Sequence, residues 1–171
     1  NIIGTLDKPT NGEVYINGKR TDLMKKNELA ILRNEVIGFV FQFYNLVQNL
    51  TAIENVELAT QICKKSLNTE QVMEKVGLAD RKNNFPSQLS GGEQQRVALA
   101  RLMIKKCDLI LADEPTGSLD TGNAEEVLKI LKSLNEEGKT VLLVTHDERI
   151  KKWGTRVIDL SEYSSRAKKA V

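Results

Sequence analysis

The stretch LSGGEQQR, at positions 89–96, joins a diglycine and a serine to the expected start of a helix. Ser90 and Glu93 have the spacing of a capping box, so we expect a long helix over residues 91–105 with the diglycine in its first turn. Glycine leaves backbone amides accessible beside the positive end of the helix macrodipole, and such a site attracts phosphate. The stretch therefore predicts contact with a nucleotide.

Length and composition favour a single soluble globular domain. The chain has 171 residues and a formal net charge of only +2, with acidic and basic side chains mixed along most of its length. We therefore expect no nucleic-acid partner. No apolar run reaches membrane-spanning length, and the first residues lack the pattern of a secretory signal. Cys63 and Cys107 do not have the spacing of a metal site, which favours a reducing compartment and packing roles for both.

The order of apolar segments predicts an α/β fold. Five runs rich in β-branched residues, each bounded by turn signals, indicate short strands at 13–16, 36–41, 108–112, 140–145 and 156–160. Residues 109–112 and 141–144 are apolar without alternation, as in parallel strands that helices cover on both faces. A helix over 125–137, with Gly138 as its stop signal, connects two of the strands.

A helical insertion interrupts this α/β pattern over residues 43–106. Segments 51–63, 69–76 and 91–105 have helical patterns, and no convincing strand lies between them. We therefore expect one domain in two parts, with an α/β core at 1–42 and 107–171 and a helical subdomain at 43–106.

Two adjacent carboxylates, Asp113 and Glu114, follow the apolar strand at 108–112. The carboxyl ends of strands in an open α/β sheet form its binding crevice. There, Asp113 is the candidate that holds Mg²⁺ and Glu114 the candidate that orients or deprotonates an attacking water. A solvated Asp-Glu turn stopped by Pro115 is the alternative, and it would be favoured if this pair stood alone.

Two further polar residues follow strands in the same way. His146 comes after the strand at 140–145, so it shares an edge of the sheet with Glu114 if their two strands are neighbours, and it could hydrogen-bond a terminal phosphate. Gln42 comes after the strand at 36–41 and could ligate a metal or bind a water through its amide. Taken singly, each is more simply a structural histidine or a polar loop residue. Three strands that each end in a residue suited to phosphate or Mg²⁺ make coincidence a poor explanation.

The motifs together resemble those of ABC-type ATPases over essentially the whole chain. LSGGEQQ at 89–95 matches the signature motif, and residues 109–114 resemble the Walker B strand. Residues 118–120 resemble the D-loop, and Gln42 and His146 the Q-loop glutamine and the switch histidine. FQFYNL at 41–46 and LTAIENV at 50–56 look most like the branch that powers lipoprotein release, macrolide efflux and peptide-antibiotic export.

The resemblance implies a role for each matching residue. Glu114 is the general base, and His146 contacts the γ-phosphate. Asp113 binds Mg²⁺ through water. Gln42 is a further candidate metal ligand, which senses the γ-phosphate and passes its state to a membrane partner. The residues that act across a dimer, on nucleotide held by the facing subunit, are Ser90, Gly91, Gly92, Glu93 and Asp120.

The resemblance also implies the fold, cofactors and partners. The fold is a P-loop NTPase-type (RecA-like) parallel sheet with an inserted helical subdomain, incomplete at its amino end. ATP and Mg²⁺ are the expected cofactors. The expected partners are a second ATP-binding subunit, in a homodimer, and a membrane-spanning permease. Through that permease the chain would lie on the inner, cytoplasmic face of the cell membrane.

One departure from the family concerns the Walker A phosphate loop, which this sequence does not contain. Residues 1–12 resemble the stretch that follows the helix of that loop. Gly138-Lys139-Thr140 is not a substitute, because it leads from a helix into a strand and Ser133 stands where the motif needs glycine. We therefore expect weak or absent ATP binding at its own site, no activity alone, and an unstable isolated chain because a central strand is missing.

Three functions remain open at this point. The first is the ATP-hydrolysing energy subunit of an ABC-type exporter, favoured because Glu114 and His146 are present. The second is a non-hydrolysing partner that lends its signature motif to a complete ATPase. The third is an ABC-type ATPase outside transport, disfavoured because neither a coiled-coil insertion nor a second cassette is present.

Overall fold

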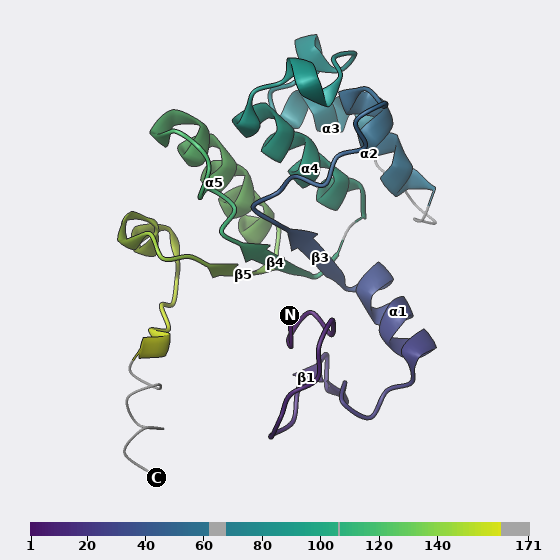
Figure 1. Cartoon of the computed structure of the whole chain (residues 1–171), viewed down its shortest axis with the longest axis vertical. Helices are drawn as coiled ribbons and strands as arrows, with labels where there is room; N and C mark the ends of the chain where they lie inside the picture. Colours follow the sequence, from purple (N-terminus) through teal and green to yellow (C-terminus); the bar gives the residue numbers. More distant parts are fainter. Residues whose placement is uncertain (62–67, 106, 162–171) are drawn as a thin grey trace.

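A three-stranded parallel sheet with most of the helices on one side organises the chain (Figure 1). The computed structural model describes residues 1–61, 68–105 and 107–161. Its sheet consists of β3 (Ile37–Val40), β4 (Leu109–Asp113) and β5 (Thr140–Val144), in that spatial order. A separate antiparallel hairpin pairs β1 (Tyr15–Ile16) with β2 (Lys19–Arg20). The predicted α/β class with a parallel sheet is confirmed.

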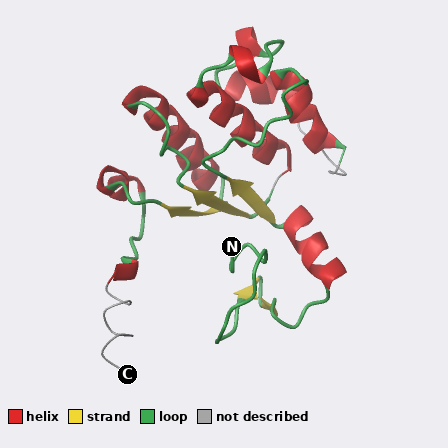
Figure 2. Cartoon of the chain, viewed as in Figure 1, coloured by secondary structure: helices red, strands yellow, loops and turns green. Residues whose placement is uncertain are grey.

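The helices alternate with these strands along the chain (Figure 2). The five α-helices and three short 3₁₀ turns among the described residues are α1 (Lys26–Glu35), α2 (Ala52–Thr60), α3 (Thr69–Lys75), η1 (Ala79–Arg81), η2 (Pro86–Gln88), α4 (Gly91–Lys105), α5 (Thr121–Glu136) and η3 (Glu148–Trp153). The bounds predicted for α4 are confirmed, and α5 begins one turn before its predicted start. The helix predicted over 51–63 is described to Thr60, and Cys63 lies outside the described residues.

Helix α4 lies at the centre of the main core. It packs against α2, α3 and α5 and against β3. Its Val97, Leu99 and Ile104 side chains are fully buried. Because α4 contacts both the helices of the insertion and the sheet, it connects the two parts of the fold.

The three strands run parallel, so their carboxyl ends lie at one edge of the sheet. Val40 pairs with Ala112, and Asp113 pairs with Val144. We call the residues that follow the strands at this edge the rim: 41–42 after β3, Asp113–Glu114 at the end of β4, and 145–146 after β5. The candidate catalytic residues all belong to it.

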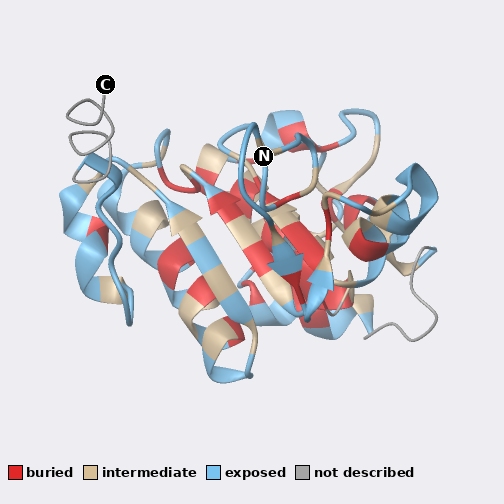
Figure 3. Cartoon of the chain, turned by 90° about the horizontal axis from the view of Figure 1, so that it is seen from below, coloured by how far each residue is buried: buried red, intermediate tan, exposed pale blue. Residues whose placement is uncertain are grey.

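The face of the sheet away from α4 and α5 is only partly covered, which corrects one expectation. Figure 3 looks onto this face, and in β5 the Leu142 and Val144 side chains are 36% and 46% exposed. The continuous apolar pattern predicted strands covered on both faces. Among the described residues α4 and α5 cover one face. Ile16 of β1, Leu32 of α1 and the turn at residues 1–7 cover the other face over β3 and β4, and β5 is left open there.

One predicted strand was wrong, and one helix was missed. Residues 156–160 do not form the predicted strand: no described strand pairs with them, and Val157, Ile158 and Leu160 are exposed. Helix α1 was missed, because its Lys- and Asn-rich start gives a weak apolar pattern and its first turn follows Lys25 rather than a usual capping residue. No helix in the described part of the chain has the length and apolar character needed to cross a membrane.

Candidate functional site

Glu114 is held at the rim by the backbone of the neighbouring strand. Its N–H donates to the carbonyl of Val144 at 2.9 Å, which continues the pairing of β4 with β5 by one residue. Its φ of +44° lies in the left-handed region. For a residue other than glycine this conformation costs about 1–3 kcal/mol. The fold therefore fixes Glu114 in a strained turn that a solvated Asp-Glu pair would not need.

The Glu114 carboxylate binds the two residues that follow β5. Its Oε1 accepts the backbone N–H of His146 at 2.9 Å and lies 2.7 Å from Nδ1 of the same residue. Its Oε2 accepts the Thr145 hydroxyl at 3.2 Å. The prediction that Glu114 and His146 share one rim is thus confirmed. Thr145 was missed, and its only signal in the sequence is a hydroxyl between an apolar strand and His146.

Exposure separates the two members of this pair. The Glu114 side chain is 22% exposed, whereas that of His146 is 86% exposed. The Thr145 hydroxyl and the His146 N–H fix the Glu114 carboxylate, which is therefore well placed to orient a water. The exposed imidazole of His146 is accessible to a bound molecule. The geometry suits general-base chemistry at Glu114, with His146 exposed to solvent beside it.

Gln42 faces the loop that follows Glu114. A Cβ added at Gly117 would lie 3.4 Å from its Nε2, so the amide lies beside this loop. Asp113 is exposed and lines a cavity whose floor is the partly covered face of the sheet, including Phe39 and Leu111. The rim therefore brings residues from three strands to one edge.

The rim can contribute oxygen ligands to a magnesium ion without a preformed cage. Within the described residues no group of three or more His, Cys, Asp or Glu side chains is arranged to hold a metal. Mg²⁺ commonly keeps several waters and takes one or two carboxylates together with substrate phosphates. The carboxylate of Asp113 and the amide oxygen of Gln42 fit that pattern.

The start of α4 has the predicted capping box. The Ser90 N–H donates to Oε2 of Glu93 at 2.7 Å, and the Glu93 N–H donates to the Ser90 hydroxyl at 3.3 Å. The bond from the Ser90 backbone holds the pKa of Glu93 below its usual value. The Glu93 carboxylate thus caps its own helix, and Ser90 remains exposed.

Both glycines of the diglycine lie against other segments of the site. A Cβ at Gly91 would lie 2.5 Å from the Tyr44 hydroxyl oxygen, and one at Gly92 would lie 2.1 to 2.5 Å from side-chain atoms of Asn123. The helix start therefore packs between the segment after Gln42 and the start of α5. Close packing requires these glycines independently of any ligand.

Asp120 caps α5 and is linked to α4. Its carboxylate accepts the backbone N–H of Asn123 at 2.9 Å and the side-chain amide of Asn123 at 2.6 Å. These bonds lower the pKa of Asp120. Asn123 in turn accepts a hydrogen bond from Arg96 of α4 at 3.2 Å. The candidate residues Asp120 and Ser90–Glu93 thus belong to one connected region, which we call the helix-start site.

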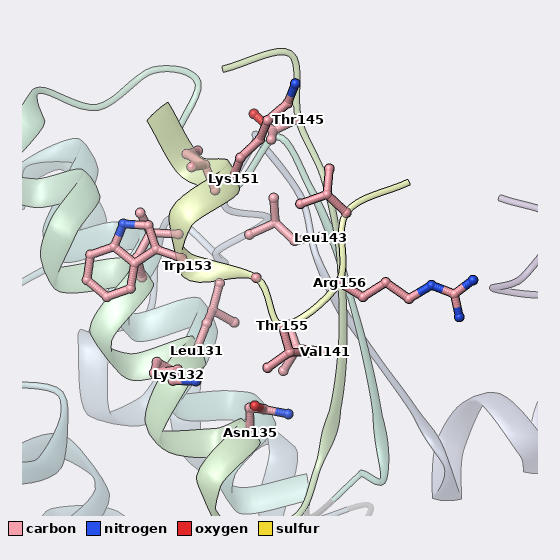
Figure 4. Close-up of a pocket in the computed structure, with 14 residues that line it drawn as sticks. Leu131, Lys132, Asn135, Val141, Leu143, Thr145, Lys151, Trp153, Thr155 and Arg156 are labelled. Carbon is pink, nitrogen blue, oxygen red and sulfur yellow. The ribbon is translucent and has the colours of Figure 1, made fainter. Parts of the chain in front are cut away.

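Two other features of the chain involve none of the predicted site residues. Lys139, in the Gly-Lys-Thr tripeptide, donates to the carbonyl of Cys107 at 3.1 Å, at the amino end of the sheet and opposite the rim. A cavity between α5, β5 and η3 is lined by Leu131, Val141 and Trp153 (Figure 4). None of the predicted site residues lines it, although Thr145 of the rim does, and Trp153 is half-buried there.

Comparison with known proteins gives a consistent family. A family model described as ABC transporter matches residues 1–117. An uncharacterized ABC transporter ATP-binding protein of Methanocaldococcus jannaschii is 46% identical over 167 residues, which is 95% of this chain and 75% of that protein. The macrolide export ATP-binding/permease protein MacB of Agrobacterium fabrum is 46% identical over the same length, but the chain spans only 26% of it.

A solved structure supports the same fold. A dimeric ATP-binding cassette in a post-hydrolysis state, bound to ADP and Pi, matches with a TM-score of 0.81 at 44% identity. The match covers 92% of this chain and 72% of that one.

Proposed function

This chain belongs to the ABC transporter family as an ATP-binding domain, and from this premise we propose that it is the ATP-hydrolysing energy subunit of a membrane exporter. The observation that carries the proposal is the Glu114 carboxylate, fixed between two strands and bound by Thr145 and His146. The export function is supported by the macrolide export relatives and by the sequence motifs within residues 41–56.

In the proposed reaction Glu114 acts on the attacking water. Its carboxylate takes a proton from the water, whose oxygen bonds to the γ-phosphorus while the bond to the ADP oxygen breaks. His146, bonded to Glu114, lies where its exposed imidazole can contact the γ-phosphate. Mg²⁺, when held by Asp113 and Gln42, supplies charge stabilisation for the phosphate oxygens.

A second ATP-binding subunit is the first proposed partner. Ser90 is exposed at the amino end of α4, where backbone amides and the helix dipole favour phosphate. We propose that Ser90, Gly91, Gly92 and Glu93 meet nucleotide held by the facing copy, with Asp120 at the same interface. The dimeric state of the similar cassette structure supports a second copy as the partner.

A membrane-spanning permease is the second proposed partner. Phe43, Val47 and Phe85 are 78%, 40% and 42% exposed, and they come from segments tied to one another through α2. Val47 bonds the side chain of Asn55, and Ala52 bonds the carbonyl of Asn84. We propose that these apolar side chains contact the permease, which would place the subunit at the inner face of the membrane. Phe43, the most exposed of the three, directly follows Gln42 in the chain.

ATP turnover tests the proposal. The protein is assayed as its gene encodes it, with any residues that precede Asn1, and compared with Glu114→Gln. Loss of the general base should lower kcat by about 10²- to 10⁴-fold. Glu125→Gln, at an exposed position in α5, is the matched control and should retain turnover.

Two outcomes would contradict this assignment. Undiminished hydrolysis in Glu114→Gln would remove Glu114 from its role. A wild-type protein that never hydrolyses ATP alone but raises the turnover of a second, complete subunit would favour the signature-lending function instead.

A further inference from the structure

Gln95 of α4 is a buried polar residue whose side chain binds two loops of the rim. Its Nε2 donates to the carbonyl of Pro115 at 2.8 Å and to the carbonyl of Phe41 at 3.3 Å. The residue is fully buried. A single amide group thus ties the helix to the segments that follow β3 and β4.

These two carbonyls adjoin residues of the candidate catalytic site. Phe41 directly precedes Gln42, and Pro115 directly follows Glu114. On the helix side, Gln95 lies about one turn after the Ser90–Gly92 start. Gln95 therefore joins the helix-start site, through hydrogen bonds, to the backbone on which Gln42 and Glu114 stand.

The amide oxygen of Gln95 shows that packing alone does not explain why glutamine occupies this position. Its Oε1 is buried and has no hydrogen-bond partner among the described residues. An unpaired buried oxygen is unfavourable, because it has given up hydrogen bonds to water. Methionine would fill a similar volume without that penalty. What glutamine adds at this position is the pair of N–H donors.

A second side chain of α4 extends the attachment. Arg101 donates to the carbonyl of Asn45 at 2.8 Å and to the Asn55 side chain at 2.6 Å. Asn55 in turn binds the backbone of Val47. Together, Gln95 and Arg101 fix the segment after β3 to α4 at Phe41 and again at Asn45, so Gln42 lies on a short span held at both ends by one helix.

We propose that Gln95 is a positioning residue of the ATPase reaction, which sets Gln42 and Glu114 together relative to the Ser90–Gly92 helix start. The proposal rests on the proposed function. When nucleotide of the facing subunit engages the start of α4, any displacement of that helix reaches both rim residues through one buried amide. The signature motif of one site and the catalytic carboxylate of the other, which are parts of the same chain, are thereby coupled.

Replacing the amide donors tests this role. In the protein as its gene encodes it, Gln95→Met should lower kcat for ATP by about 10- to 100-fold, the loss expected for a misplaced catalytic group. The KM for ATP should stay within about twofold, because Gln95 does not contact the nucleotide. The melting temperature should fall only modestly, because removal of the unpaired Oε1 offsets part of the cost of leaving the carbonyls of Phe41 and Pro115 without this donor. Asn135→Leu is the matched control: its amide donates to the carbonyl of Lys139 at 3.0 Å, at the opposite end of the sheet, and its loss should leave kcat unchanged.

A second variant gives a pH signature that packing would not produce. Gln95→Glu keeps the shape, but an ionised carboxylate cannot donate to the two carbonyls. Burial favours the protonated carboxyl, whose O–H can donate to one of them. The ratio of its kcat to that of the wild type at the same pH should therefore rise as the pH falls.

The outcomes separate this inference from the proposed function. Wild-type hydrolysis that Glu114→Gln abolishes, combined with an unchanged kcat in folded Gln95→Met, would overturn the role of Gln95 and leave the proposed function intact. A kcat loss matched by a large fall in melting temperature, with a pH-independent ratio for Gln95→Glu, would also overturn it, because Gln95 would then be a structural residue. Absence of hydrolysis in the wild type would count against the proposed function itself.

Discussion

The two candidate regions of this chain differ in how far apart in sequence their bonded partners lie. In the helix-start site, Ser90 bonds Glu93, and Asp120 bonds Asn123, each three residues away. At the rim, Glu114 bonds Thr145 and His146, 31 and 32 residues away. The helix caps of the first region are built by local geometry, and packing of Arg96 on Asn123, 27 residues away, then joins its two parts. The bonds of the second region exist only when β4 and β5 pair in the correct register.

This difference predicts different consequences of mutation. Changes in the helix-start site should act on stability, because they remove caps and close packing. Changes at the exposed side of the rim should act on rate, because the backbone pairing that holds it is left in place. Four variants or conditions test this contrast, and they follow in order of decreasing expected effect.

His146→Ala should give the largest change, and it should be a change in rate. Loss of the imidazole beside Glu114 should lower kcat by about 10²-fold, as expected when a group that orients the reacting atoms is removed. The side chain is 86% exposed, so the melting temperature should change little. Steady-state turnover and thermal melting of the same samples check both expectations. A destabilised variant with near-normal turnover would reverse the contrast.

Gly92→Ala should mainly destabilise the protein. The added Cβ would lie 2.5 Å from the Cβ of Asn123, so α4 or α5 must move to accommodate it. Overpacking of this kind costs about 1–3 kcal/mol. Chemical denaturation measures the loss. Gly122→Ala is the matched control, because there the new Cβ meets only one oxygen at 3.4 Å. If both variants were equally stable, the close packing of α4 on α5 would not matter.

The same contrast explains which features the sequence predicted. The bounds of α4 follow from a diglycine and a capping box, and both signals lie within four residues of the helix start. The shared edge of Glu114 and His146 was foreseen only on condition that their strands are neighbours, and their direct hydrogen bond was not predicted. Thr145 and Gln95 were missed, because their roles depend on where side chains point once distant segments have packed.

Burial was the least predictable property. The apolar run in β5 is the same whether one face or two are covered, and the covering elements lie outside the strand. Residues 156–160 likewise have the composition of a strand, but a strand forms only beside a partner. The local sequence therefore predicts whether a segment favours a helix or a strand better than it predicts which segments will pack against it.

Ser90→Ala should have a smaller effect on stability. It removes the hydroxyl that accepts the Glu93 N–H at 3.3 Å, and loss of a helix cap costs about 1 kcal/mol. Ser90→Thr keeps the hydroxyl and should restore most of the stability. The free energy of unfolding, from denaturant titrations of the three proteins, distinguishes them. Equal values for Ser90→Ala and the wild type would show that the cap contributes nothing.

The charge of Glu93 should give the smallest effect, visible as a pH dependence. The Ser90 N–H holds the pKa of Glu93 in the folded protein below its usual 4.5. A carboxylate with a lowered folded-state pKa contributes stability above the unfolded-state value and loses it as the pH falls toward the folded-state value. Glu93→Gln can still accept that N–H but carries no charge. Near pH 7 it should be less stable than the wild type by about 0.3–1 kcal/mol, the usual effect of a carboxylate in the first turn of a helix. This difference should shrink as the pH falls below the usual value, because the wild type then loses the same charge. A difference that stays constant between pH 7 and pH 3 would mean that shape, and not charge, accounts for the contribution of Glu93 to the helix-start site.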